Sequence, residues 1–166
     1  MPKATTMLAA CGLLATGGLA ADGLFNTSYS ARVERVIDGD TVEVVVDLAP
    51  GMSQTVDVRE RDLDTPEKRR GRFGAQCEAE RELGLKVSAL VTDTLAEGTA
   101  VRIDNVGLGK YAGRWVGDIR FALDGRIVDL GDWLIGQGLA VHYDGGTKRK
   151  VWCKNETRLP TTVEVK

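Results

Sequence analysis

Two short acidic stretches, residues 37–41 and 64–67, carry the side chains whose types and spacing could do chemistry. Asp40 and Asp64 each offer a carboxylate, and the backbone carbonyl of Thr65 offers a third oxygen. Oxygen ligands of this kind suit Ca²⁺ or Mg²⁺ rather than zinc or copper. The two stretches therefore predict a site for a hard divalent cation.

Three further charged side chains extend this inventory. Arg59 and Arg114 carry guanidinium groups, which bind phosphate bidentately and keep their charge, so they could stabilise a phosphodiester under attack. Glu67 offers a carboxylate that could orient or deprotonate the attacking water. The sole histidine, His142, lies in a segment expected to be irregular, so a histidine-based mechanism is poorly supported. Each group alone is typical of a turn, a helix cap or a surface charge, but their combination favours cation-assisted phosphodiester cleavage.

The hydrophobic pattern predicts a scaffold for these residues. Alternation of apolar and polar residues is typical of half-buried strands, and an apolar stripe at helical spacing is typical of a surface helix. We expect strands at 32–37, 41–48, 54–63, 99–106 and 114–123, and helices at 74–97 and 130–138. The stretch 65–67 also has the form of a helix start. This order fits a mainly β or α+β fold, namely a five-stranded OB-fold barrel with two helices packed on it.

The ordered set of motifs resembles the staphylococcal nuclease-like (thermonuclease) family. The stretches that carry the resemblance are 36–41, 58–59, 64–67, 110–111 and 113–114, followed by 77–81, 134–135, 138–140, 143–146 and 152–153. The later stretches look like the exported bacterial branch of the family. The resemblance covers about residues 31–153, which we expect to form one nuclease-like domain.

The resemblance implies an OB barrel that binds Ca²⁺ and hydrolyses DNA and RNA with little sequence preference, leaving 3′-phosphates. It implies that Asp40, Asp64 and the Thr65 carbonyl bind the Ca²⁺. We expect the substrate to be single-stranded or locally open, and the protein to act as a monomer.

The resemblance also implies roles for the remaining site residues. Arg59 and Arg114 would grip the scissile phosphate, and Glu67 would act on the water. Lys110 and Tyr111 match positions near the substrate phosphate.

Three features depart from the family pattern. Glu60 and Asp62 stand where the family usually has an apolar and a small residue. By strand alternation Asp62 would share a face with Asp64, where the added acids could enrich the cation site or compete for Arg59. Ala112 adds one residue ahead of Arg114, and the chain ends soon after residue 153, which leaves the family's C-terminal helix short or absent.

Residues 1–20 are expected to be a secretory signal peptide. Lys3 is their only charge, residues 7–20 are rich in Leu, Ala and Gly, and small residues precede a cleavage point near Ala20. The alternatives are an uncleaved N-terminal anchor and lipidation at Cys11. We therefore expect a secreted or periplasmic protein, membrane-anchored only if this segment is not cleaved. Residues 154–166 are polar and are expected to form a loose tail.

The cysteines and the net charge agree with export. If Cys11 leaves with the signal, Cys77 and Cys153 remain, and an even pair in an oxidising compartment predicts a disulfide. The alternative is two unrelated buried thiols. The formal net charge is −2, so the protein has little general attraction for a polyanion. Contacts with nucleic acid must come from local basic clusters such as 68–72 and 148–150.

Two other functions remain open at this point. One is a catalytically weak OB-fold module that binds single-stranded nucleic acid or a partner protein, since OB folds often only bind. The other is an envelope-tethered structural protein. The presence of all the catalytic-type side chains favours the nuclease.

Overall fold

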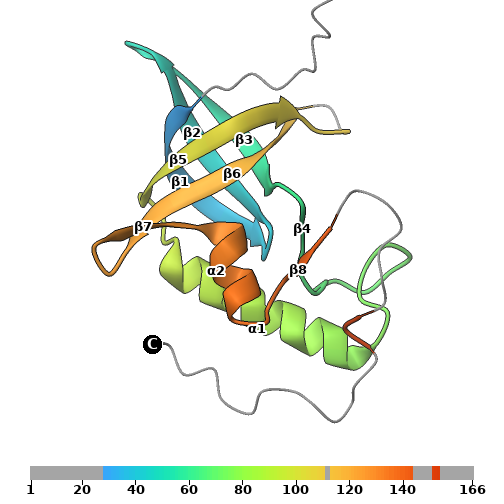
Figure 1. Cartoon of the computed structure of the whole chain (residues 1–166). Helices are drawn as coiled ribbons and strands as arrows, with labels where there is room; N and C mark the ends of the chain where they lie inside the picture. Colours follow the sequence, from blue (N-terminus) through green and yellow to red (C-terminus); the bar gives the residue numbers. More distant parts are fainter. Residues whose placement is uncertain (1–27, 111–112, 144–150, 154–166) are drawn as a thin grey trace, which may run out of the picture.

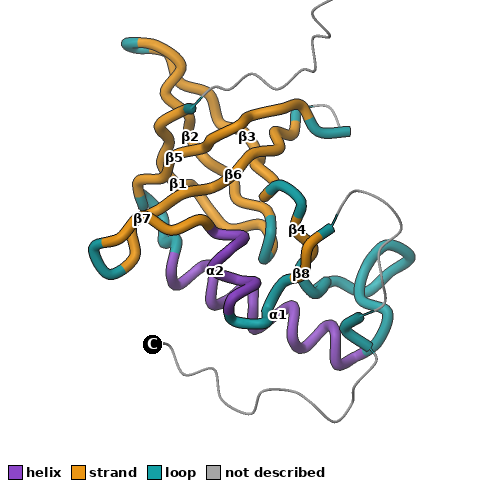
Figure 2. Tube along the Cα trace, viewed as in Figure 1, coloured by secondary structure: helices purple, strands orange, loops and turns teal. Residues whose placement is uncertain are grey.

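The computed structural model describes residues 28–110, 113–143 and 151–153. The expected signal peptide, the expected C-terminal tail, Tyr111 and Ala112 lie outside the described residues. The described chain is mainly β with two helices (Figures 1 and 2). The strands are β1 (Tyr29–Asp38), β2 (Thr41–Ala49), β3 (Met52–Glu60), β4 (Leu63–Asp64), β5 (Ala100–Leu108), β6 (Arg114–Leu123), β7 (Arg126–Asp129) and β8 (Val141–His142). The helices are α1 (Glu78–Thr94) and α2 (Leu130–Gly136).

Six strands form one sheet in the order β3-β2-β1-β5-β6-β7. The first three are an antiparallel meander, and β5 pairs antiparallel with β1 and β6. β3 also pairs in parallel with β6, which joins the two ends of the run from β3 to β6. Five strands are therefore linked in a closed ring of pairings, and β7 extends beyond it. The separate two-stranded sheet pairs β4 with β8.

The core lies between the inner face of this sheet and the two helices. Alternate residues of β2 and β3 point inward, because side chains alternate between the faces of a strand. They meet apolar residues from α1 and α2 below the strands (Figure 1). The fully buried members include Val42, Val44, Val46, Val58, Val91, Ile119, Leu130 and Leu134. Burial of these side chains is the main stabilising contribution to the fold.

Two predicted boundaries are wrong near the site. β3 ends at Glu60 rather than 63, because Asp62 adopts a positive φ of 51° in a turn before β4. Strand alternation therefore does not place Asp62 on a face with Asp64. Asp62 is exposed, and its carbonyl accepts a hydrogen bond from the Tyr143 N–H at 2.8 Å.

The predicted helix start at residues 65–67 is also wrong. Residues 65–77 form a long loop between β4 and α1 (teal in Figure 2), and α1 begins only at Glu78. Cys77 is the helix N-cap, and its sulfur accepts from the Glu80 N–H at 3.4 Å. The long helix thus spans Glu78–Thr94 rather than 74–97, and the short helix ends at Gly136 rather than 138. β7 and β8 are strands that the sequence pattern did not predict.

Candidate phosphodiesterase site

Asp40 and Arg59 form an ion pair at one end of the sheet. Asp40 lies in the two-residue turn between β1 and β2, and its side chain is buried, with 5% of the residue exposed. Arg59 lies on β3 opposite Thr41. Its Nη2 is 2.6 Å from Asp40 Oδ2, and its Nη1 donates to Oδ1 at 3.2 Å. Thr41 Oγ1 donates to the same Oδ1 at 2.8 Å. The guanidinium thus meets the carboxylate through both of its oxygens.

The second acidic stretch lies next to this pair. Arg59 Nη2 also donates to the carbonyl of Leu63 at 3.4 Å, one residue before Asp64. The turn itself contacts Thr65, since a Cβ built on Gly39 would lie only 2.9 Å from Thr65 Oγ1. A glycine is therefore required for the turn to approach this closely. The structure brings Asp40, Arg59 and Leu63, the residue before the 64–67 stretch, to one place.

Asp64 and Thr65 are buried at this place. Asp64 is 4% exposed and Thr65 3% exposed. Trp152 Nε1 donates to Asp64 Oδ2 at a long 3.5 Å, which links the chain segment 151–153 to the site. A carboxylate with this little exposure needs polar or ionic partners, because desolvation of an unpaired charge is costly. This end of the fold therefore buries two carboxylates, that of Asp40 paired with Arg59 and that of Asp64 one residue after the carbonyl that Arg59 also contacts.

Arg114 shares a sheet face with Arg59. It is the first residue of β6 and pairs in register with Asp57 in the parallel β3–β6 ladder. Residues paired in register point to the same face, and Asp57 and Arg59 are two apart on β3. Both arginines therefore lie on the outer face of neighbouring strands. Lys110 is exposed and close by, since the Gly109 N–H donates to the Arg114 carbonyl at 2.9 Å.

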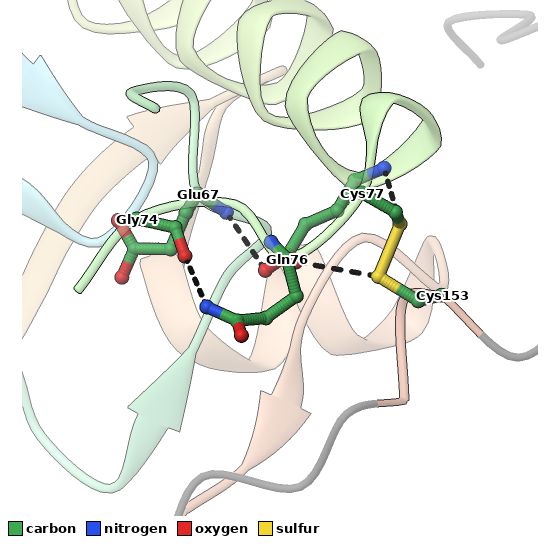
Figure 3. The surroundings of a disulfide bond; sticks show 6 residues. Glu67, Gly74, Gln76, Cys77 and Cys153 are labelled. Carbon is green, nitrogen blue, oxygen red and sulfur yellow. Dashed lines mark hydrogen bonds between the residues drawn. A yellow bond between two sulfur atoms is a disulfide. The ribbon is translucent and has the colours of Figure 1, made fainter. Parts of the chain in front are cut away.

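Glu67 is half-buried in the loop that follows β4. Its backbone N–H points at the carboxylate of Glu80, with 3.5 Å between nitrogen and Oε1. Helix α1 packs directly on this backbone, because a Cβ built on Gly84 would lie 2.6 Å from the Glu67 carbonyl carbon. Figure 3 shows Glu67 beside the segment that enters α1, close to the disulfide. Glu67 is thus held by its backbone, and its side chain extends from a fixed position.

The donor chemistry fits a hard cation. Asp40 and Asp64 carry buried carboxylates, and Thr65 follows Asp64 directly, so the two stretches offer three oxygens of the kind that a hard cation prefers. One group of three side chains in the described ranges has ligand atoms within 4.8 Å of one another, namely Cys77, Glu80 and Cys153. Its two sulfurs are joined in a disulfide, so this group is not a cation site.

Glu60 neither enriches this site nor competes for Arg59. It points inward with Val56 and Val58, and its Oε2 accepts from the backbone N–H of Ile119 at 2.9 Å. Burial raises the pKa of the Glu60 carboxyl well above its usual value, and the nearby Asp129 raises the pKa further. Glu60 is therefore part of the core, and Asp62 lies in the exposed turn.

Three contributors to the site were missed in the sequence. Glu80 holds the backbone of Glu67, and Trp152 contacts Asp64. Lys68 Nζ donates to the carbonyl of Ile37 and to Ser88 Oγ, which ties the loop to β1 and α1. Spacing gives one signal for Glu80, since a capping side chain followed three residues later by Glu is the pattern of a helix N-terminus. The sequence marks Trp152 only as part of the stretch 152–153 and Lys68 only as part of the basic cluster 68–72, and neither pattern predicts these contacts.

The predicted disulfide is confirmed, with Cys77 bonded to Cys153 across 76 positions (Figure 3). It indicates an oxidising environment. Across the part of the chain that the structure describes, neither helix has the length and apolar character needed to span a bilayer. Comparison with models of known protein families gives no match, and neither does comparison with curated proteins.

Proposed function

We propose that this protein is an exported, Ca²⁺-dependent nuclease that hydrolyses DNA and RNA with low sequence specificity. The observation that carries the proposal is that the Arg59 guanidinium binds both the Asp40 carboxylate and the Leu63 carbonyl, which comes directly before Asp64. The closed ring of five paired strands supports an OB-type barrel as the scaffold. The disulfide supports export, because such bonds persist in oxidising compartments.

In this proposal Asp40, Asp64 and the Thr65 carbonyl hold the cation, which when bound supplies positive charge to a phosphate oxygen. Arg59 and Arg114 reach the same phosphate from neighbouring strands. They stabilise the negative charge that builds on its oxygens, and they do so best where water is excluded. Glu67 orients a water molecule and accepts its proton as the water oxygen attacks phosphorus. The bond to the 5′ oxygen breaks, this oxygen takes a proton from solvent and leaves as a hydroxyl, and the phosphate stays on the 3′ oxygen.

Arg59 has a second task in the protein without substrate. Its pairing with buried Asp40 offsets part of the cost of removing that carboxylate from water. Removing the guanidinium would therefore destabilise the fold as well as the chemistry. Arg59→Lys keeps the positive charge and removes the bidentate fork, so it separates the two effects better than Arg59→Ala does.

The test is cleavage of single-stranded DNA and of RNA by the purified protein with Ca²⁺ and with a chelator. We expect cleavage that the chelator abolishes, and a loss of at least about 10²-fold in kcat for Arg59→Lys or Glu67→Ala, as for other transition-state groups. Arg32→Ala is the matched control, because Arg32 also pairs with an aspartate, Asp47 at 3.3 Å, but at the other end of β1 and β2. Its activity should equal that of the wild type.

Retained binding of single strands with no cleavage under any cation would refute the nuclease and favour a binding module. Cleavage that persists in chelator, or wild-type rates in Glu67→Ala, would refute the assigned roles. Each variant is checked for folding by its thermal midpoint before its rate is compared.

A further inference from the structure

The loop between Glu67 and Gln76 is closed at its base by one buried carboxylate. The Gln76 N–H donates to Glu80 Oε2 at 2.7 Å, and the Glu67 N–H faces Oε1 of the same group at 3.5 Å. The disulfide at Cys77 fixes the adjoining end of α1 (Figure 3). A compact surface loop with its ends held together in this way is an Ω-type loop, and such loops are frequently functional. We call residues 68–75 the basic loop.

The basic loop is also fixed internally. The Ala75 N–H donates to the Arg69 carbonyl at 2.8 Å, and the Gly74 N–H donates to the Gly71 carbonyl at 3.1 Å. The Gln76 side chain donates to the Gly74 carbonyl at 2.7 Å. These bonds define one backbone conformation for the tip at 71–74. A side chain carried by this tip is therefore presented to solvent without the entropic cost of ordering a mobile loop on binding.

The side chain presented there is Phe73, which is 86% exposed. Exposure alone does not mark a contact, because single exposed apolar residues are common on protein surfaces and Leu108 is equally exposed at 87%. What distinguishes Phe73 is the positive charge around it. The Arg72 guanidinium carbon lies 5.5 Å from the ring centroid, and Arg69 is exposed on the same loop. Arg70 is partly neutralised, since its Nη2 pairs with Glu78 at 2.6 Å. An exposed ring with one guanidinium over its face and a second exposed on the same loop is suited to a ligand that carries both flat apolar faces and anionic groups.

We propose that the basic loop binds single-stranded nucleic acid, with Phe73 stacking on a base and Arg69 and Arg72 contacting the adjacent phosphates. A single strand exposes base faces that a duplex hides, and base–aromatic stacking tolerates any sequence. The protein as a whole has a formal net charge of −2, so a polyanion is drawn to this local cluster rather than to the general surface. The path of the bound nucleic acid rests on the proposed function. The basic loop begins directly after Glu67, so a single strand bound there would lead toward the Glu67 side chain.

The test measures binding separately from cleavage. The probe is a 5′-fluorescent single-stranded oligodeoxynucleotide about twelve nucleotides long, and anisotropy is read in chelator so that no cation-dependent cleavage occurs. We expect Phe73→Ala to weaken binding by about 5- to 150-fold, the effect of losing one base stack, and Phe73→Trp to retain it. Ile127→Ala is the matched control, an apolar residue 67% exposed on β7, and should bind as the wild type does.

Two further measurements identify the contacts. Replacing successive nucleotides by abasic ones should, at one position, weaken wild-type binding while leaving the affinity of Phe73→Ala unchanged. Arg72→Gln should reduce the slope of log Kd against log salt by about 0.7, as for the loss of one phosphate contact with a single strand. Phe73→Ala should also keep the thermal midpoint of the wild type, because its ring is exposed.

Equal affinity of the wild type and Phe73→Ala would overturn the inference, as would tighter binding of a duplex than of the single strand. Undetectable binding by the wild type at low salt would also overturn it. These results are separable from the cleavage assay. If Phe73→Ala binds more weakly and the wild type cleaves nothing, the binding role of the basic loop is supported and the nuclease is refuted. If the wild type cleaves and Phe73→Ala binds as tightly as the wild type, the nuclease is supported and the binding role of the loop is refuted.

Discussion

The Cys77–Cys153 disulfide should make a large contribution to the stability of this fold. It joins residues 76 positions apart, and in the chain-entropy model a closed loop of that length lowers the entropy of the unfolded chain enough to stabilise the protein by about 4.5 kcal/mol. Domains of this size have total stabilities of roughly 5–15 kcal/mol. Replacing both cysteines by serine should therefore remove about 30% or more of the stability.

Urea unfolding followed by tryptophan fluorescence measures this loss. With a slope of about 1.5–2 kcal/mol per molar urea, the midpoint of the double serine variant should fall by about 2–3 M. The free energy of unfolding should also depend less steeply on urea concentration in the oxidised wild type than in the double serine variant, because the cross-linked unfolded chain exposes less surface. The wild type reduced before unfolding serves as a control for the substitutions and should match the variant. A midpoint shift below about 0.5 M would refute the estimate.

The same variant should also lose activity beyond its loss of stability. Cys77 caps α1 in the turn that holds Glu80 against Glu67, and Cys153 adjoins Trp152, which contacts Asp64. Without the covalent bond both attachments are free to separate, so we expect a lower cleavage rate at temperatures where the variant is fully folded. A wild-type rate under those conditions would show that the bridge acts on stability alone.

Gly84→Ala should displace the backbone of Glu67, because the new Cβ would approach it to 2.6 Å. We expect the free energy of unfolding to fall by about 1–3 kcal/mol, and the cleavage rate to fall as well. Wild-type values in both assays would contradict this. Gly39→Ala should act likewise on Thr65, with weaker cation binding by calorimetry as the diagnostic result. Glu60→Gln should change the pH dependence of stability. Burial raises the pKa of Glu60 above the usual 4.5, so the folded state holds a proton that the unfolded state releases. Wild-type stability should therefore fall by up to about 1.4 kcal/mol per pH unit from about pH 4.5 up to the folded pKa, and the glutamine variant should lack this fall.

The class of fold was predictable from the sequence because the strands carry a clear signal. Val42, Val44 and Val46 recur at every second position of β2 and are fully buried on one face, whereas Glu43 and Val45 between them are only half-buried. Turn residues at 38–40 and 124–125 mark hairpins that the structure contains. Local pattern and tertiary packing agree at these places. The parallel pairing of β3 with β6 has no local signal, and it is this pairing that places Arg114 beside β3.

The predicted helix at Thr65-Pro66-Glu67 fails for a physical reason. A threonine followed by proline is a favourable helix start, but here Thr65 and Pro66 are buried against the turn at Gly39 and against Gly84. The N–H of Glu67 is directed to a side chain of α1 instead of to a helical partner. Contacts that lie far away in the sequence therefore override the local propensity, as they often do.

The identities of the site residues were easier to predict than their pairings. The sequence shows that Asp40 and Arg59 are present, but not that the guanidinium binds the carboxylate at 2.6 Å. That ion pair has a consequence for mechanism. A phosphate that binds Arg59 must compete with Asp40 for the guanidinium, and a cation that binds Asp40 weakens the hold of the carboxylate on the arginine. Cation and phosphate should therefore bind cooperatively. The phosphate takes Arg59 from Asp40 and so leaves the carboxylate for the cation, and the cation takes Asp40 from Arg59 and so leaves the guanidinium for the phosphate.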